Sequence, residues 1–150
     1  MGVLEKKQIL VKRNQRGFTL LEIMVVVVII GLLLAIVAPN LIDRKGQAEV
    51  TKAKFDVRAL ESALDAYRLD MGSYPSTDGG LEALTQKPSD APRWKEGGYI
   101  KSLPKDPWGR DYQYLNPGVQ GTIDVFSLGA DGAQGGEGLN ADIGNWNLEN

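Results

Sequence analysis

Residues 18–38, FTLLEIMVVVVIIGLLLAIVA, are the stretch of sequence that determines the fold. These 21 residues contain a single ionisable side chain, that of Glu22, and apolar residues cover every face of the helix that they would form. At about 1.5 Å per residue, such a helix is ~31 Å long, close to the hydrocarbon thickness of a bilayer. A chain of 150 residues has no core deep enough to cover this helix on all sides. The segment is therefore predicted to span a membrane.

The residues before this segment predict its orientation. Residues 1–17 carry five basic side chains and one acid, and basic residues beside a span favour the cytoplasmic side. The sequence therefore predicts a cytoplasmic N-terminus and an exported C-terminal part. The alternative interpretation is a secretory signal peptide, because Ala35, Ala38 and Pro39 resemble a cleavage site after the apolar stretch.

Glu22 is the anomaly of the apolar segment. A carboxylate inside a span costs up to ~3 kcal/mol on insertion scales and normally marks a function or a partner. The alternative is an interfacial acid whose side chain extends toward the lipid head groups. If the chain were cut between Gly17 and Phe18, a new α-amino group would stand four residues before Glu22. The amine and the carboxylate could then neutralise each other, within one helix or between neighbours in an assembly.

The junction Gly17-Phe18-Thr19-Leu20-Leu21-Glu22, followed by an apolar run, resembles the class III signal of type IV pilins and of the pseudopilins of type II secretion. The resemblance implies that an inner-membrane prepilin peptidase cuts after Gly17, so that residues 1–17 are a cleaved leader. It also implies that Phe18 becomes the N-methylated N-terminus, and that Glu22 guides the docking of one subunit on another.

A second helical pattern follows the apolar segment, and residues 39–72 are predicted to form an amphipathic helix. Its apolar residues recur at alternating spacings of three and four, which place one apolar stripe on the helix: Val50, Ala53, Val57, Leu60, Leu64, Tyr67 and Met71. A coiled coil is one interpretation of the stripe, but we favour packing on its own domain, because strands that need a cover follow in the sequence. Gly72 is suited to end the helix.

Pro39 stands at the junction of the two helical patterns. Proline removes a backbone hydrogen bond and typically kinks or loosens a helix, so the sequence predicts a helix break here. The resemblance to pilins implies that the two halves nevertheless form one long helix, which loosens around Pro39 in a filament.

Residues 73–150 are predicted to form an exported globular part with an α+β fold. A short helical stretch is expected near 81–84, and strands are expected over 111–115 and 123–128, joined as a hairpin through 116–118. One face of this small sheet is expected to rest on the helical stripe. Several segments between 74 and 146 resemble, in order, those of the major pseudopilins of type II secretion. The resemblance implies the type IV pilin-like fold, in which a long N-terminal helix packs on a small antiparallel sheet.

The stretch 128–146 is where a cation site would form. It is rich in glycine and holds five side chains with oxygen donors: Asp131, Glu137, Asn140, Asp142 and Asn145. Calcium takes six to eight oxygen ligands and suits such a loop, although a solvated acidic loop is the alternative from composition alone. The resemblance implies a bound calcium ion, held by the Leu128 carbonyl and by the side chains of Asp131, Asn140 and Asp142. Asn140 stands where an acid is common in the family, which predicts a lower affinity.

Several absences narrow the class of function. The chain contains neither cysteine nor histidine, which excludes a disulfide, a Cys-ligated zinc site and catalysis by Ser-His-Asp or Cys-His. A net charge of -2 gives no overall support to nucleic-acid binding. The enzyme that remains possible is a membrane-anchored hydrolase, for example a glycosidase, using two carboxylates from among Glu82, Asp106, Asp111 and Asp124.

The resemblance implies a structural protein and not an enzyme: a pseudopilin subunit whose periplasmic fibre helps to drive folded proteins through an outer-membrane channel. The partners that it implies are other copies of this chain, minor pseudopilins, the prepilin peptidase and the inner-membrane secretion platform. The implied location is the bacterial inner membrane, crossed once, with the C-terminus in the periplasm. A type IV pilin for adhesion or motility is the alternative, but the missing cysteines and the acidic, Gly-rich tail argue against it.

Overall fold

The computed structural model describes residues 17–149 of the chain, except for the side chains of residues 38–43. The elements follow in the order α1 (Leu20–Met71), η1 (Leu81–Leu84), β1 (Gln113–Leu115), β2 (Asp124–Ser127), η2 (Gly138–Asn140) and β3 (Ile143–Gly144). The chain divides into two compact units, of which the first ends at Asn40 and the second comprises Leu41–Asn150.

Thr19 fixes where α1 begins. Its Oγ1 accepts a hydrogen bond from the backbone N–H of Glu22 at 3.2 Å, and its carbonyl accepts from the N–H groups of Glu22 and Ile23. Thr19 is therefore the N-cap, and Glu22 lies in the first turn, where a negative charge complements the helix dipole. The sequence pattern Thr-x-x-Glu is that of a capping box.

The described residues contain one helical window that is long and apolar enough to cross a membrane, Leu20–Val37, with a mean hydropathy of 3.2. None of this window is buried inside the single chain. By length and composition it agrees with the predicted span of residues 18–38.

Pro39 lies inside α1, so the apolar and amphipathic helices form one element of 52 residues. The helix break that the sequence predicts at Pro39 is thus not a helix end in the single chain, and its loosening in a filament stays a prediction. The helix ends beyond Met71, where Gly72 has a φ of 87° and its N–H donates to the Arg68 carbonyl at 2.7 Å. The predicted glycine cap is therefore confirmed.

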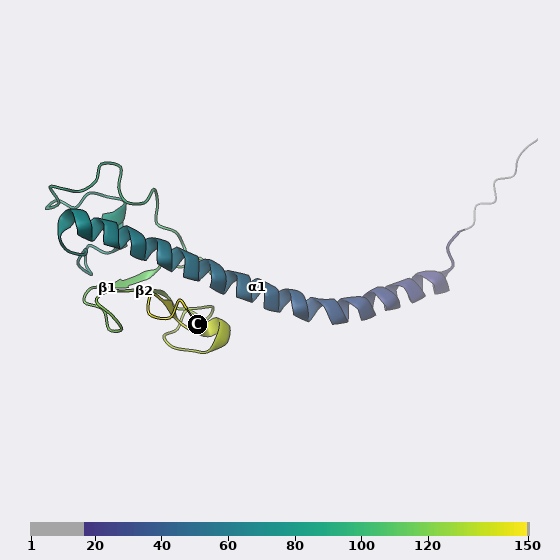
Figure 1. Ribbon diagram of the computed structural model, residues 1–150. Helices are drawn as coiled ribbons and strands as arrows, with labels where there is room; N and C mark the ends of the chain where they lie inside the picture. The colour runs from purple at the N-terminus through teal and green to yellow at the C-terminus, as the bar shows by residue number, and fades with distance from the viewer. Residues whose placement is uncertain (1–16, 150) are drawn as a thin grey trace, which may run out of the picture. The chain divides into compact units, whose positions relative to one another are not determined.

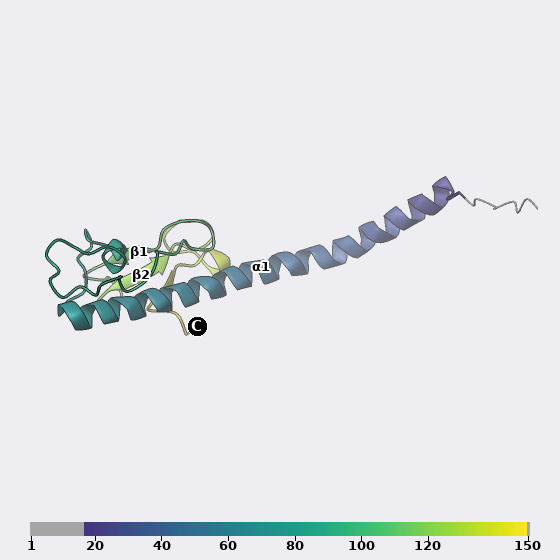
Figure 2. The ribbon, with the colours of Figure 1, turned by 90° about the horizontal axis from the view of Figure 1, so that it is seen from above.

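The core of the second unit forms on the stripe of α1. Five of the seven stripe residues are buried, Ala53, Val57, Leu60, Leu64 and Tyr67, whereas Val50 and Met71 are half-buried. Side chains from η1, from the strands and from the segment just before β1 pack against them, among which Leu84, Tyr112, Tyr114 and Val125 are buried. Figures 1 and 2 show β1 and β2 alongside the part of α1 that ends at Met71. All described core residues belong to this unit, so a fragment of residues 43–150 keeps the whole core.

The sheet is antiparallel, with the order β1-β2-β3, and the predicted hairpin is confirmed by the pairing of Tyr114 with Val125. Both predicted strands are shorter than the sequence indicated, because Asp111 forms only an isolated bridge with Lys105 and regular pairing begins at Gln113. The sequence analysis missed β3, a two-residue strand that pairs with Phe126 and Ser127. Its addition makes β2 the central strand, and all four β2 residues are buried.

Three tyrosine hydroxyl groups fasten the connecting segments to acids on α1. Tyr74 donates to Asp65 at 2.6 Å. Tyr99 donates to Asp70 at 2.9 Å, and Tyr112 donates to Asp56 at 2.8 Å. Burial and then the hydrogen bond to the carboxylate raise the pKa of each phenol above its ordinary value of 10.0. Burial also raises the pKa of Tyr114, to about 12.

These pKa shifts predict a loss of stability in alkaline solution. Above pH 10 the unfolded chain gives up phenolic protons that the folded chain still holds. The contribution of these phenols to the free energy of unfolding should therefore be constant below pH 10 and fall as the pH rises from 10 toward about 12. Urea unfolding of the 43–150 fragment at a series of pH values measures this fall. The Tyr112→Phe variant should be less stable by about 1 kcal/mol at pH 7, having lost its bond to Asp56, but should show a shallower alkaline fall. If the free energy of unfolding fell equally steeply with pH in the variant and the wild type, Tyr112 would not contribute to the alkaline loss of stability.

Candidate functional site

The C-terminal loop, residues 128–142, connects the central strand β2 to the edge strand β3. Its two arms touch at Gly129, where an added Cβ would lie 2.7 Å from the carbonyl oxygens of Asn140 and Ala141. Gly129 also has a φ of 65°, which favours glycine. The fold thus brings the beginning of the loop, where the Leu128 carbonyl stands, close to Asn140 at its end.

Asp142 is the predicted ligand whose surroundings best fit a cation. Its Oδ2 accepts the N–H of Gly135 at 2.9 Å, and its own N–H donates to the Gly135 carbonyl at 3.1 Å. Its Oδ1 is buried and accepts no hydrogen bond, the one such side-chain atom in the part of the chain that the structure describes. A buried carboxylate oxygen without a partner is costly, and a cation would satisfy it.

The other predicted ligands are placed less tightly. Asp131 is exposed, and its Oδ1 accepts the N–H of Ala133 at 3.0 Å. Asn140 ends η2, and its N–H donates to the carbonyl of Glu137. Within residues 17–149, no group of three or more acidic side chains is arranged to hold a metal ion. A cation here would therefore depend on the Asn140 amide and on backbone carbonyls as well as on Asp131 and Asp142.

Arg110 is a residue at this loop that the sequence analysis did not single out. Its guanidinium donates to the Gly129 carbonyl and lies against Gly132. Arg110 is held in turn by Asp106, whose carboxylate is buried and accepts from the Arg110 and Trp108 backbone N–H groups and from Ser127 Oγ. The Gly129 carbonyl therefore already faces one positive charge. The Asp-Pro-Trp-Gly-Arg turn was the signal in the sequence, but its link to Gly129 is tertiary.

The carboxylates that an enzyme would have used perform structural tasks instead. Asp106 is occupied as just described. Asp124 is buried and accepts the N–H groups of three successive residues, Val119, Gln120 and Gly121. These two acids therefore close turns and are not available to a substrate.

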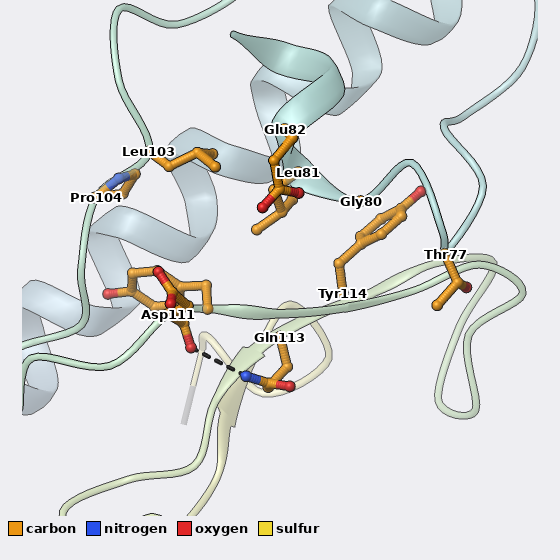
Figure 3. Close-up of a pocket in the computed structure, with 10 residues that line it drawn as sticks. Thr77, Gly80, Leu81, Glu82, Leu103, Pro104, Asp111, Gln113 and Tyr114 are labelled. Carbon is orange, nitrogen blue, oxygen red and sulfur yellow. Dashed lines mark hydrogen bonds between the residues drawn. The ribbon is translucent and has the colours of Figure 1, made fainter. Parts of the chain in front are cut away.

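The remaining two acids line an open cavity of about 150 Å³ beside β1. Figure 3 shows Glu82 entering it from η1 and Asp111 from the segment before β1, with Leu103 and Tyr114 on the wall. Asp111 is mostly exposed and is paired with Lys105 Nζ at 2.6 Å. An exposed acid neutralised by a lysine is poorly suited to general acid–base catalysis.

The predicted processing site lies just outside the helix. Gly17 and Phe18 precede the N-cap Thr19 in a segment without regular structure, and Phe18 is 79% exposed. Among the described residues, no atom lies within 4 Å of a Cβ added to Gly17, so none of them requires glycine there. Residues 1–16 of the predicted leader lie outside the described residues. Glu22 is exposed in the first turn of α1.

Comparison with known proteins matches nearly the whole chain. Residues 40–146 match the family model of the type II secretion system (T2SS), protein G, and residues 12–38 match that of the prokaryotic N-terminal methylation motif. The type II secretion system core protein G of Vibrio cholerae is 64% identical, covering 91% of this chain and 95% of the relative. That of Pseudomonas aeruginosa is 56% identical, covering 90% and 97%. The crystal structure of the major pseudopilin from the type 2 secretion system of enterohaemorrhagic Escherichia coli matches with a TM-score of 0.62 and 50% identity, over 71% of this chain and 90% of that chain.

Proposed function

The chain belongs to the family of protein G of the type II secretion system, and we propose that it polymerises into a periplasmic filament that drives the export of folded proteins. Membership gives it a structural pseudopilin role in type II secretion, and the carboxylate-enzyme interpretation is wrong. As a pseudopilin it assembles with itself and with other components of the secretion system. The match to protein G also favours secretion over the adhesion or motility of a type IV pilin.

One observation in the structure carries the filament proposal. The window Leu20–Val37 exposes all of its apolar side chains in the single chain. Such a surface has to be covered by lipid or by other subunits. Because either lipid or other subunits can cover this helix, the subunit can reside in the membrane before assembly and then pack into a bundle of helices.

Glu22 would direct this transfer. After cleavage, the Phe18 amine of one subunit can meet the Glu22 carboxylate of its neighbour, and the low dielectric of a helix bundle strengthens the attraction. In the membrane the same carboxylate is penalised unless it is paired, so pairing favours the assembled state.

The finer assignments of place and partner also belong to the proposal. The basic residues before the span favour a cytoplasmic N-terminus, with the globular unit in the periplasm and one crossing of the inner membrane. The prepilin peptidase would cleave and methylate the chain. The inner-membrane platform and the minor pseudopilins would be its contacts during assembly.

Calcium is the cofactor that we propose for the C-terminal loop. Its ligands would be the Leu128 carbonyl, Asp131, Asn140 and Asp142, and the buried Oδ1 of Asp142 supports a cation there. The chain has no disulfide to hold this loop. The glycines in the loop lose much conformational entropy when it is ordered, and a bound ion would offset that cost.

Processing of the N-terminus gives the first test of this function. Protein extracted from membranes that contain an active prepilin peptidase should begin with N-methylated Phe18, as mass spectrometry of the N-terminal peptide would show. Recovery of the intact N-terminus, or of a chain cleaved after Ala38, would contradict the proposal.

The docking role of Glu22 predicts that its removal impairs filament assembly but not insertion of the chain into the membrane. Glu22→Ala should be inserted and processed normally, but its filament yield and its secretion of exported protein should fall roughly tenfold or more, since a charge pair in low dielectric is worth more than ~1.4 kcal/mol. Sheared filaments and exported enzyme activity measure the two quantities. The exposed acid Glu96 offers a matched control, because Glu96→Ala leaves the helix unchanged. Wild-type filaments from Glu22→Ala would refute the docking role.

Calcium binding should be visible as thermal stability. Binding to the folded state alone stabilises by ~2.7 kcal/mol when calcium is a hundredfold above Kd, so EGTA should lower the Tm of the 43–150 fragment by roughly 10 °C. Magnesium should substitute poorly, because it demands a tighter octahedron. Asp131→Ala and Asp142→Ala should abolish most of the difference, whereas the neighbouring Glu137→Ala should preserve it. Superimposable wild-type melts with and without calcium would remove the site from the proposal.

A further inference from the structure

Leu139 is the only large apolar side chain between Gly129 and Ala141. It is 41% exposed, so more than half of it is covered although the neighbouring loop residues are open to solvent. Part of its cover comes from α1, where Gly46 is buried against it. A Cβ added to Gly46 would lie 2.5 Å from Leu139 Cδ1 and 3.0 Å from Cδ2. The Leu139 side chain therefore occupies the space that Gly46 leaves on the surface of α1 by having no side chain, which we call the notch.

Gly46 supplies space and not an unusual backbone. It lies in the interior of α1 and is not among the glycines with positive φ. Glycine weakens a helix interior relative to alanine, so local helix formation gives no reason for glycine at this position. The close approach of the Leu139 side chain gives one.

The contact bears directly on the candidate ligands. The Leu139 carbonyl accepts the N–H of Ala130 at 2.9 Å, which joins the two arms of the loop. Asp131 follows Ala130 on one arm, and Asn140 follows Leu139 on the other. The side-chain contact with Gly46 and the backbone hydrogen bond to Ala130 thus meet in one residue, so a shift of the Leu139 backbone would move both arms relative to each other.

We propose that the contact of Leu139 with Gly46 is the seat of the C-terminal loop on α1 and that it is coupled to calcium binding; this inference rests on the calcium site proposed above. A loop that is already seated has lost part of its conformational freedom, so an ion that needs the ordered loop binds with less entropic cost. The coupling is reciprocal: calcium makes the seat more persistent to the same degree that the seat raises calcium affinity. Leu139 is a positioning residue, because it offers no ligand from its side chain.

The experiment is a double-mutant cycle on the full chain in detergent micelles, with Gly46→Ala, Leu139→Ala and the combination of both. Calorimetric titration with calcium chloride gives the affinity, and melting in EGTA gives the Tm without calcium. Each single variant should bind calcium roughly threefold to tenfold more weakly than wild type, and the combination should bind no more weakly than Leu139→Ala alone. Leu69→Ala is the matched control, because Leu69 is an exposed leucine of α1 at 80% and should leave the affinity unchanged.

The melts in EGTA test the contact in a second way. The effect of Gly46→Ala on the Tm should have opposite signs with and without the Leu139 side chain, which a general loss of structure would not produce. Gly46→Ala should lower the Tm while Leu139 fills the notch, and should raise it in the Leu139→Ala background, where only the gain in helix propensity remains. If Gly46→Ala and Leu139→Ala bound calcium as tightly as the wild type, the coupling would be overturned but the calcium site would not. A wild-type chain that binds no calcium would overturn both. An increase in Tm from Gly46→Ala in both backgrounds would overturn the seat itself.

Discussion

The burial of one stripe on α1 is the interaction on which the rest of the second unit depends. The strands are only two to four residues long, and a sheet of three such strands is not stable by itself. It forms because Val57, Leu60 and Leu64 present a continuous apolar surface for it to cover. The tyrosines then fasten the surrounding segments to acids at the borders of the stripe, so that the helix organises both the apolar and the polar contacts.

The two ends of α1 differ in whether their apolar side chains are covered by the same chain. The second unit covers the stripe with its own side chains, whereas none of the described residues covers Leu20–Val37. An isolated subunit therefore needs a lipid environment, and an assembled one needs neighbours. Glu22 is capped into the first turn by Thr19. We propose that the cost of its carboxylate in lipid makes the second environment favourable. The filament that we propose would complete this burial.

The C-terminal loop is held by scattered contacts and not by a core. Asp106 positions Arg110, Arg110 reaches the Gly129 carbonyl, and Leu139 rests against Gly46. These contacts leave the Oδ1 of Asp142 buried and without a partner. A loop with this little apolar burial gains relatively much from one additional ligand, and for that reason calcium and the seat on α1 are proposed to act together.

Local patterns in the sequence determined most of the architecture. The apolar length of residues 18–38, the three-and-four spacing of the stripe and Gly72 predict α1 and its end, because these signals depend on neighbours within one or two helical turns. The junction Gly17-Phe18 and the loop ligands came from resemblance to a family, and no periodicity would have provided them. The tertiary structure alone revealed β3, the link from Arg110 to Gly129 and the contact of Leu139 with Gly46. Each of these joins residues that lie far apart in the chain, and which distant residues meet is set by how the loops close over the stripe, which the local sequence does not encode.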